Sequence, residues 1–162
     1  MGAPALVPMS VATAAAAVNV ADHLGVAMSR PLRVAVVGLG GRGTIYARLL
    51  ASNPSAAVVQ IAEPRAAVRG ELGDELGLPP EAQLEDWREL AAGPRLADAV
   101  VLAVQDRFHL EAVVAFAGAG YDILCEKPLA GTEAACAEVV AAAEQAGVFL
   151  GVCHVLRFTP TT

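Results

Sequence analysis

A glycine-rich turn is the first group of residues in this chain that could do chemistry. It reads Gly38-Leu39-Gly40-Gly41-Arg42-Gly43 and follows the apolar run Val34-Ala35-Val36-Val37. In a dinucleotide site with this spacing, the first glycine permits a tight turn, the second lets backbone N–H groups approach a pyrophosphate, and the third allows close packing of helix on sheet. The phosphates then lie at the positive N-terminus of that helix. The spacing therefore predicts a cofactor-binding loop over residues 38–43.

A carboxylate follows where such a site needs one. Glu63 comes directly after a second apolar run, Ala57–Ala62, about 20 residues beyond the glycine turn. It can accept hydrogen bonds from the adenosine ribose hydroxyls, and its charge repels the extra phosphate of NADP. Arg65 lies two residues on, where a guanidinium can pair with a 2′-phosphate or stack on adenine. The sequence therefore favours NAD and leaves NADP open.

A charged tripeptide, Glu126-Lys127-Pro128, ends another apolar run, Asp122–Cys125. If that run is a parallel strand, the tripeptide lies at the carboxyl edge of the sheet, where open α/β sheets bind ligands. Lys127 there can hydrogen-bond a substrate hydroxyl or polarise a carbonyl, while Pro128 restricts the backbone. The alternative is a solvated charge pair at the start of a loop, and these residues alone leave both interpretations open.

Apolar runs alternate with helical stretches from Arg33 onward, a pattern that predicts an α/β fold: a doubly wound parallel sheet (Rossmann fold) in three αβα layers, as a single domain. The near-continuous apolar runs indicate strands buried on both faces. We expect strands at Arg33–Val37, Ala57–Ala62, Ala99–Val104, Asp122–Cys125 and Val148–Cys153, with a short one near Gln83. We expect helices at Thr44–Ser52, Arg65–Leu76, Leu84–Ala91, His109–Ala119 and Glu133–Ala146, with Thr132 as an N-cap and Gly77, Gly93, Gly120 and Gly147 at helix ends.

Composition excludes several classes of partner. The chain has 162 residues, a net charge of −6 and only 17% charged residues, so it has no basic face for a nucleic acid. Its apolar runs are interrupted well before the about 18 residues that a membrane span needs. Cys125, Cys136 and Cys153 lack the paired spacing of a zinc site or a short disulfide framework, so we predict no metal and a reducing, cytoplasmic compartment.

Residues 1–30 differ from the rest of the chain. They contain the alanine-dominated tract Val11–Val18, and no Lys or Arg precedes Arg30. We interpret residues 1–30 as a leader that is disordered or not translated, with Met28 as the initiator. Residues 31–155 then form the dinucleotide-binding domain, and residues 156–162 begin a connection to a missing substrate domain.

Further motifs complete a resemblance to a known family. Asp106-Arg107-Phe108-His109 follows the Glu63-Pro64-Arg65 segment, and His154-Val155-Leu156-Arg157-Phe158-Thr159-Pro160 follows the Glu126-Lys127-Pro128 tripeptide. In this order, from Leu32 to Pro160, the chain resembles the N-terminal NAD(P)-binding domain of the Gfo/Idh/MocA oxidoreductases. The tripeptide is the most specific part of the resemblance. Members oxidise or reduce sugars, cyclitols and related compounds with NAD or NADP.

The resemblance implies roles for individual residues. It implies that Glu126 and Lys127 line the nicotinamide and substrate region, with Lys127 catalytic, and that Asp106 and His109 lie near the cofactor. His154 and Arg157 are expected on the substrate side. A purely structural role stays open for both histidines: His109 as a polar group at the start of a helix, and His154 as a side chain at a strand end that hydrogen-bonds to backbone.

In the family a second α/β domain supplies much of the substrate pocket, and that domain is missing from these 162 residues. We therefore expect the cofactor domain of an NAD(P)-dependent oxidoreductase of sugar-like substrates, a homo-oligomer being open for the full-length form. Two alternatives remain, a stand-alone dinucleotide-binding module and a truncated remnant without catalysis.

Overall fold

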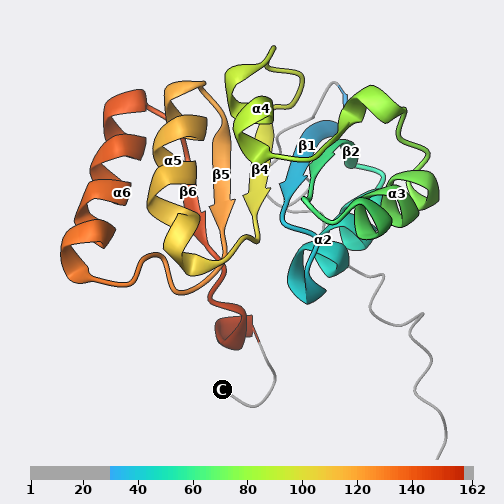
Figure 1. Cartoon of the computed structure of the whole chain (residues 1–162). Coiled ribbons are helices and arrows are strands. Elements are labelled where there is room, and N and C mark those ends of the chain that lie inside the picture. The colour runs from blue at the N-terminus through green and yellow to red at the C-terminus, as the bar shows by residue number, and fades with distance from the viewer. Residues whose placement is uncertain (1–29, 159–162) are drawn as a thin grey trace, which may run out of the picture.

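Six parallel strands form the centre of the fold, in the order β3-β2-β1-β4-β5-β6 (Figure 1). The structure is a computed structural model and describes residues 30–158; the predictions for residues 1–29 and 159–162 lie outside the described residues. The strands are β1 (Leu32–Val37), β2 (Ala56–Ala62), β3 (Gln83–Leu84), β4 (Ala99–Leu102), β5 (Asp122–Cys125) and β6 (Leu150–Val152). The helices are α2 (Gly41–Ala51), α3 (Ala66–Glu75), α4 (Trp87–Ala92), α5 (His109–Gly118) and α6 (Glu133–Ala146), with the 3-10 turns η2 (Pro80–Ala82), η3 (Asp106–Phe108) and η4 (Val155–Phe158).

Helices cover the sheet on both faces, so the predicted three-layer, doubly wound fold is confirmed (Figure 1). Successive side chains of a strand point to opposite faces. On β1, Ala35 and Val37 therefore pack in a core with α4, α5 and α6, while Val34 and Val36 pack in a second core with α2 and α3. The strand order reverses between β1 and β4, and ligands bind at such a point in open α/β sheets.

The ends of two elements beside the glycine turn differ from the prediction. Helix α2 begins at Gly41 instead of Thr44, because Gly40 is its N-cap and the remaining residues of the turn form its first turn. Gly38 makes the bend itself with φ of +83°, a conformation that side-chain-bearing residues rarely adopt. Strand β4 ends at Leu102 instead of Val104.

The helix predicted at Leu84–Ala91 is wrong at its start. Gln83–Leu84 pairs with β2 as the expected short strand, and Asp86 then caps α4 by accepting the Arg88 backbone N–H at 2.9 Å. Gly93 ends α4 as predicted, with a φ of −82°, in contrast to the positive φ of Gly77, Gly120 and Gly147. Thr132 caps α6 as predicted, by accepting the Ala135 N–H at 3.2 Å.

The prediction of burial on both faces is wrong for β5. Ile123 and Cys125 are buried against α5 and α6, whereas Leu124 on the opposite face is 37% exposed. The reason is that α2 and α3 pack over β1, β2 and β4, and no helix among residues 30–158 packs over β5 and β6 on that side. The last strand is also shorter than predicted, Leu150–Val152 instead of Val148–Cys153.

Candidate functional site

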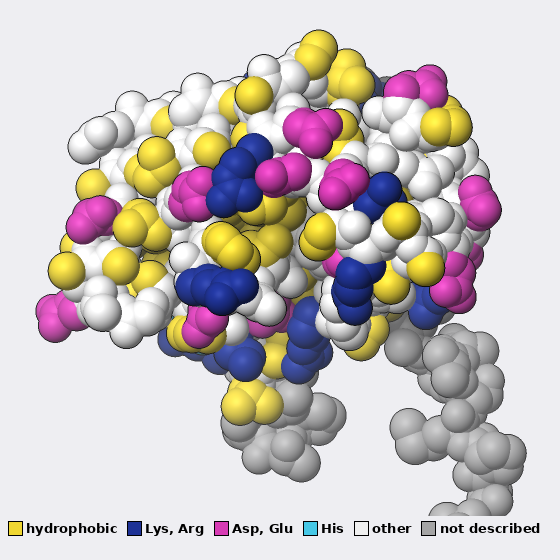
Figure 2. Space-filling model, viewed as in Figure 1, with side chains coloured by type: hydrophobic (Ala, Val, Ile, Leu, Met, Phe, Trp, Pro, Cys, Tyr) yellow, Lys and Arg dark blue, Asp and Glu magenta, His cyan; other side chains and the backbone are white. Residues whose placement is uncertain are grey.

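The carboxyl ends of the central strands open onto a groove of about 700 Å³. Figure 2 shows this face of the molecule, with basic side chains on both sides of a hollow that has apolar side chains at its floor. The groove extends from the glycine turn to the start of α4 and the loop after β4. Its lining residues are Val37, Gly38, Gly40, Ala62, Glu63, Pro64, Arg65, Glu85, Asp86, Trp87, Arg88, Ala103, Val104, Gln105, Arg107 and Phe108.

The glycine turn has the shape that a pyrophosphate needs. A Cβ on Gly43 would lie 1.8 Å from the Gly38 carbonyl oxygen, so the helix and the turn are in direct contact. A Cβ on Gly40 or Gly41 would meet nothing within 4 Å, so this side of the turn is open. The first turn of α2 has no acidic side chain, and its leading N–H groups have no partner within the helix. The residues present therefore fit an anionic group at this helix N-terminus.

Glu63 is buried at the end of β2, with 4% of its surface exposed. Its Oε2 accepts the Leu39 backbone N–H at 2.8 Å, which ties the glycine turn to β2. Its Oε1 accepts the Arg65 Nε–H at 2.7 Å and the Arg65 backbone N–H at 3.1 Å. Burial raises the pKa of Glu63, but the hydrogen bonds from Arg65 and Leu39 outweigh it and hold the pKa below its usual value. Glu63 is therefore an anion at neutral pH.

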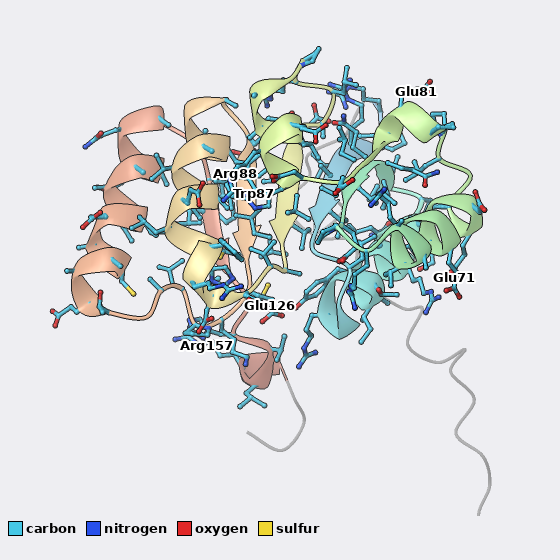
Figure 3. All side chains as sticks on the ribbon, viewed as in Figure 1. Glu71, Glu81, Trp87, Arg88, Glu126 and Arg157 are labelled. Atoms are coloured by element: carbon cyan, nitrogen blue, oxygen red, sulfur yellow. The ribbon has the colours of Figure 1, made fainter. Side chains whose placement is uncertain are left out.

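A stacked cluster of Trp87, Arg88 and Phe108 forms the other side of the groove, and the sequence reasoning missed it. The Arg88 guanidinium lies 4.4 Å from the centre of the Trp87 ring and 5.9 Å from that of Phe108. Two hydrogen bonds of 2.8 Å to the Glu111 carboxylate hold it there. Figure 3 shows Trp87 and Arg88 at α4, in front of the sheet. The signal that could have found the cluster is Trp87 itself, the only tryptophan of the chain, three residues after the end of a strand.

Glu126 lies buried at the end of β5, toward α2 (Figure 3). Its Oε1 accepts the Tyr46 hydroxyl at 2.5 Å, and its Oε2 accepts the Lys127 backbone N–H at 3.0 Å. The Arg42 Nε is 4.0 Å from Oε1, so the predicted turn residue Arg42 is turned toward Glu126. The glycine turn and the tripeptide, distant in sequence, thus meet at one carboxylate.

Lys127 is exposed, and its ammonium group has no hydrogen-bond or ion-pair partner among residues 30–158. It lines a smaller pocket of about 200 Å³ together with Cys153, His154, Val155, Leu156 and Arg157. The structure therefore brings together the three residues that were predicted on the substrate side.

Asp106 and His109 begin η3 and α5, the two elements that follow β4, but they differ in environment. The His109 ring is 1% exposed, with Nδ1 2.8 Å from the Pro128 carbonyl oxygen and Nε2 3.1 Å from that of Val104. Both ring nitrogens therefore face backbone, and the histidine joins the loops after β4 and β5. Asp106 is exposed and accepts the Arg107 N–H at 3.0 Å, and the groove is lined by its neighbours.

Two features are absent from residues 30–158. None of the helices there is both long and apolar enough to cross a membrane. No cluster of three or more His, Cys, Asp or Glu side chains there could hold a metal ion.

Comparison with protein families identifies the chain. The profile of the Gfo/Idh/MocA family, described as an oxidoreductase family with an NAD-binding Rossmann fold, matches residues 32–154. The chain belongs to this family. As a Gfo/Idh/MocA member with the groove described above, it is an NAD-binding Rossmann domain.

Curated Gfo/Idh/MocA relatives include enzymes of sugar and cyclitol metabolism. A 1,5-anhydro-D-fructose reductase from Ensifer adhaerens is 45% identical over 69 residues, which are 43% of this chain and 20% of that protein. A myo-inositol 2-dehydrogenase from Thermotoga maritima is 36% identical over 98 residues, which are 60% of this chain and 28% of that protein. The chain thus spans between a fifth and a third of the length of these relatives.

Solved structures agree in fold. A probable dehydrogenase from Thermotoga maritima has 32% identity and a TM-score of 0.73 over 80% of this chain and 38% of that chain. A biliverdin reductase from Synechocystis, solved with biliverdin and NADP+, has 25% identity and a TM-score of 0.73 over 81% of this chain and 40% of that chain.

Proposed function

We propose that the chain is the cofactor domain of an NAD-dependent oxidoreductase that acts on a sugar, a cyclitol or a related hydroxyl compound. The observation that carries the proposal is the glycine turn, which leaves no room for a Cβ at Gly43 but is open at Gly40 and Gly41. This combination suits a pyrophosphate at the start of α2. The sugar and cyclitol enzymes among the relatives support the substrate class.

The electrostatics of the groove favour NAD over NADP. Glu63 is buried and anionic beside the place where the ribose would bind, and it would repel a 2′-phosphate. Arg65, the cation that could offset this repulsion, already donates its Nε–H to Glu63 at 2.7 Å. The positive charge of Arg65 is therefore neutralised by Glu63, and the pair presents no net positive charge to the 2′-phosphate of NADP.

Different residues of the chain would bind different parts of the cofactor and the substrate. Gly38, Leu39, Gly40, Gly41, Arg42 and Gly43 would hold the pyrophosphate, and Glu63 the ribose, with Asp106 and His109 near the cofactor. Lys127, whose ammonium is unpaired and exposed, would donate a hydrogen bond to the reacting substrate oxygen. Bound NAD supplies the hydride acceptor for oxidation of the carbon that bears this oxygen. His154 and Arg157, beside Lys127, would contact the substrate.

The setting of this domain is also part of the proposal. Residues 31–155 are the cofactor domain, residues 1–30 a leader, and residues 156–162 lead to a further domain that completes the substrate pocket. We place the full-length enzyme in the cytoplasm, with a small-molecule substrate, no nucleic-acid or membrane partner, and a homo-oligomer open for the full-length form.

Calorimetric titration of the chain with NAD and with NADP tests the proposal. We expect NAD to bind at least about tenfold more tightly than NADP, which corresponds to about 1.4 kcal/mol. Glu63→Gln should narrow this ratio, since it removes the charge that faces the ribose. Glu75→Gln is the matched control, because Glu75 pairs with Arg48 on the outer surface. A folded chain that binds neither dinucleotide would refute the proposal.

A further inference from the structure

Tyr46 joins helix α2 to the loop after β5. Its hydroxyl donates to Glu126 Oε1 at 2.5 Å, across 80 positions of sequence. The second oxygen of the same carboxylate, Oε2, accepts the Lys127 backbone N–H at 3.0 Å. Glu126 is only 6% exposed, so water does not compete freely for these bonds. One buried carboxylate therefore connects the Tyr46 side chain to the Lys127 backbone.

Glu126 depends on Tyr46 for this connection. A buried carboxylate needs hydrogen-bond donors, and Tyr46 is the one side chain that donates to Glu126 within residues 30–158. The guanidinium of Arg42, 53% exposed, stays 4.0 Å away. Burial, and then the hydrogen bond to Glu126, raise the pKa of Tyr46 well above its usual value. The hydroxyl is therefore a donor throughout the physiological pH range.

The position of the Lys127 side chain depends on its backbone, because its ammonium group has no partner among the described residues. Three hydrogen bonds hold that backbone. The Glu126 N–H donates to the Leu102 carbonyl at 2.9 Å, the Pro128 carbonyl is 2.8 Å from His109 Nδ1, and the Lys127 N–H donates to Glu126. Of these three bonds, only the one from the Lys127 N–H is accepted by a side chain, that of Glu126, whose position depends in turn on another side chain, that of Tyr46.

Tyr46 also lies on the element that would carry the cofactor phosphates. It follows Gly43 by three residues in α2, so the glycine turn and the Glu126 anchor are one helical turn apart on a single rigid element.

We infer that Tyr46 is a positioning residue: its hydroxyl fixes Glu126, Glu126 fixes the Lys127 backbone, and the Lys127 side chain is thereby held in the nicotinamide region. The inference rests on the proposed function, since it takes NAD as the ligand of the groove.

The test compares two ligands and one backbone amide in the whole chain. NAD and ADP-ribose share the adenosine and the pyrophosphate, and only NAD has the nicotinamide. For Tyr46→Phe we expect the Kd for NAD to change about threefold to tenfold, because Glu126 and Lys127 border the nicotinamide, with the Kd for ADP-ribose unchanged. Hydrogen exchange of the Lys127 amide, followed by NMR, should become about tenfold faster.

Tyr121→Phe is the matched control. This tyrosine is fully buried, whereas Tyr46 is half-buried. It directly precedes β5, at the opposite end of that strand from Glu126, and its hydroxyl has no hydrogen-bond partner among the described residues. The substitution should change neither the ratio of the two Kd values nor the exchange of the Lys127 amide.

Several outcomes would overturn the inference. An equal change of both Kd values in Tyr46→Phe would mean that Tyr46 supports only the fold of the glycine turn, and unchanged values would mean that Lys127 does not depend on it. Fast exchange of the Lys127 amide in the unsubstituted chain would refute the link whether or not the variant folds. If the unsubstituted chain binds neither ligand, the proposed function fails, and amide exchange still decides on the link.

Discussion

Gly43→Ala should destabilise the fold by about 3 kcal/mol, because helix α2 lies too close to the glycine turn for a Cβ. A Cβ there would lie 1.8 Å from the Gly38 carbonyl oxygen and 2.9 Å from its carbonyl carbon, whereas ordinary contact begins at 3.4 Å. Both atoms belong to the backbone, so no rotamer change relieves the clash. The better helix propensity of alanine, at most about 1 kcal/mol, is already deducted in this figure. For a domain of this size, the net loss corresponds to a fall in Tm of about 10 °C.

Thermal unfolding followed by circular dichroism measures this effect. Gly41→Ala is the matched control in the same helical turn, because its Cβ would meet nothing within 4 Å. Its Tm should stay the same or rise slightly, since alanine restricts the unfolded chain. A Gly43→Ala variant that melts within about 2 °C of the unsubstituted chain would refute the close contact between helix and turn.

Three further predictions concern other parts of the molecule. The Arg30 guanidinium lies 2.6 Å from the Asp98 carboxylate and holds the pKa of that carboxyl well below its usual range. This ion pair therefore stabilises the fold fully above about pH 4, and its contribution is lost as the pH falls toward the lowered pKa. Asp98→Asn should therefore lower stability by about 1 kcal/mol at pH 7, with a smaller difference from the unsubstituted chain in urea melts at pH 3. We expect the adenine of ADP to stack on the cluster of Trp87, Arg88 and Phe108 in the groove. ADP should therefore change the fluorescence of Trp87, the only tryptophan of the chain, and Arg88→Ala should weaken ADP binding about threefold to tenfold in the same titration. An unaltered affinity would mean that the adenine binds elsewhere. Burial raises the pKa of Cys125 to about 12, so its thiol should react with a disulfide reagent only after unfolding, whereas the half-buried Cys136 should react in the native chain. Peptide mapping locates the labelled cysteine, and prompt labelling of Cys125 in the native chain would contradict its burial.

Most of the fold and part of the site could be predicted because the signals are local. The alternation of apolar runs and helical stretches predicted the doubly wound sheet, because the spacing of apolar residues in each segment reflects the backbone geometry of that segment. The errors lie where tertiary packing decides. Leu84 pairs with β2 in the short strand instead of starting a helix, because β2 offers it an edge, and Leu124 is exposed because α2 and α3 lie over other strands.

The sequence by itself determined the candidate phosphate turn at residues 38–43, the carboxylate Glu63 and the tripeptide that contains Lys127, because each depends on residue type and spacing along the chain. Only the tertiary structure showed that Tyr46 holds Glu126 across 80 positions and that Arg88 stacks in the groove with Glu111 behind it. These contacts join elements that the chain brings together only by packing on a common sheet. No spacing in the sequence encodes such pairs, because their distance is set by how the helices pack against the strands.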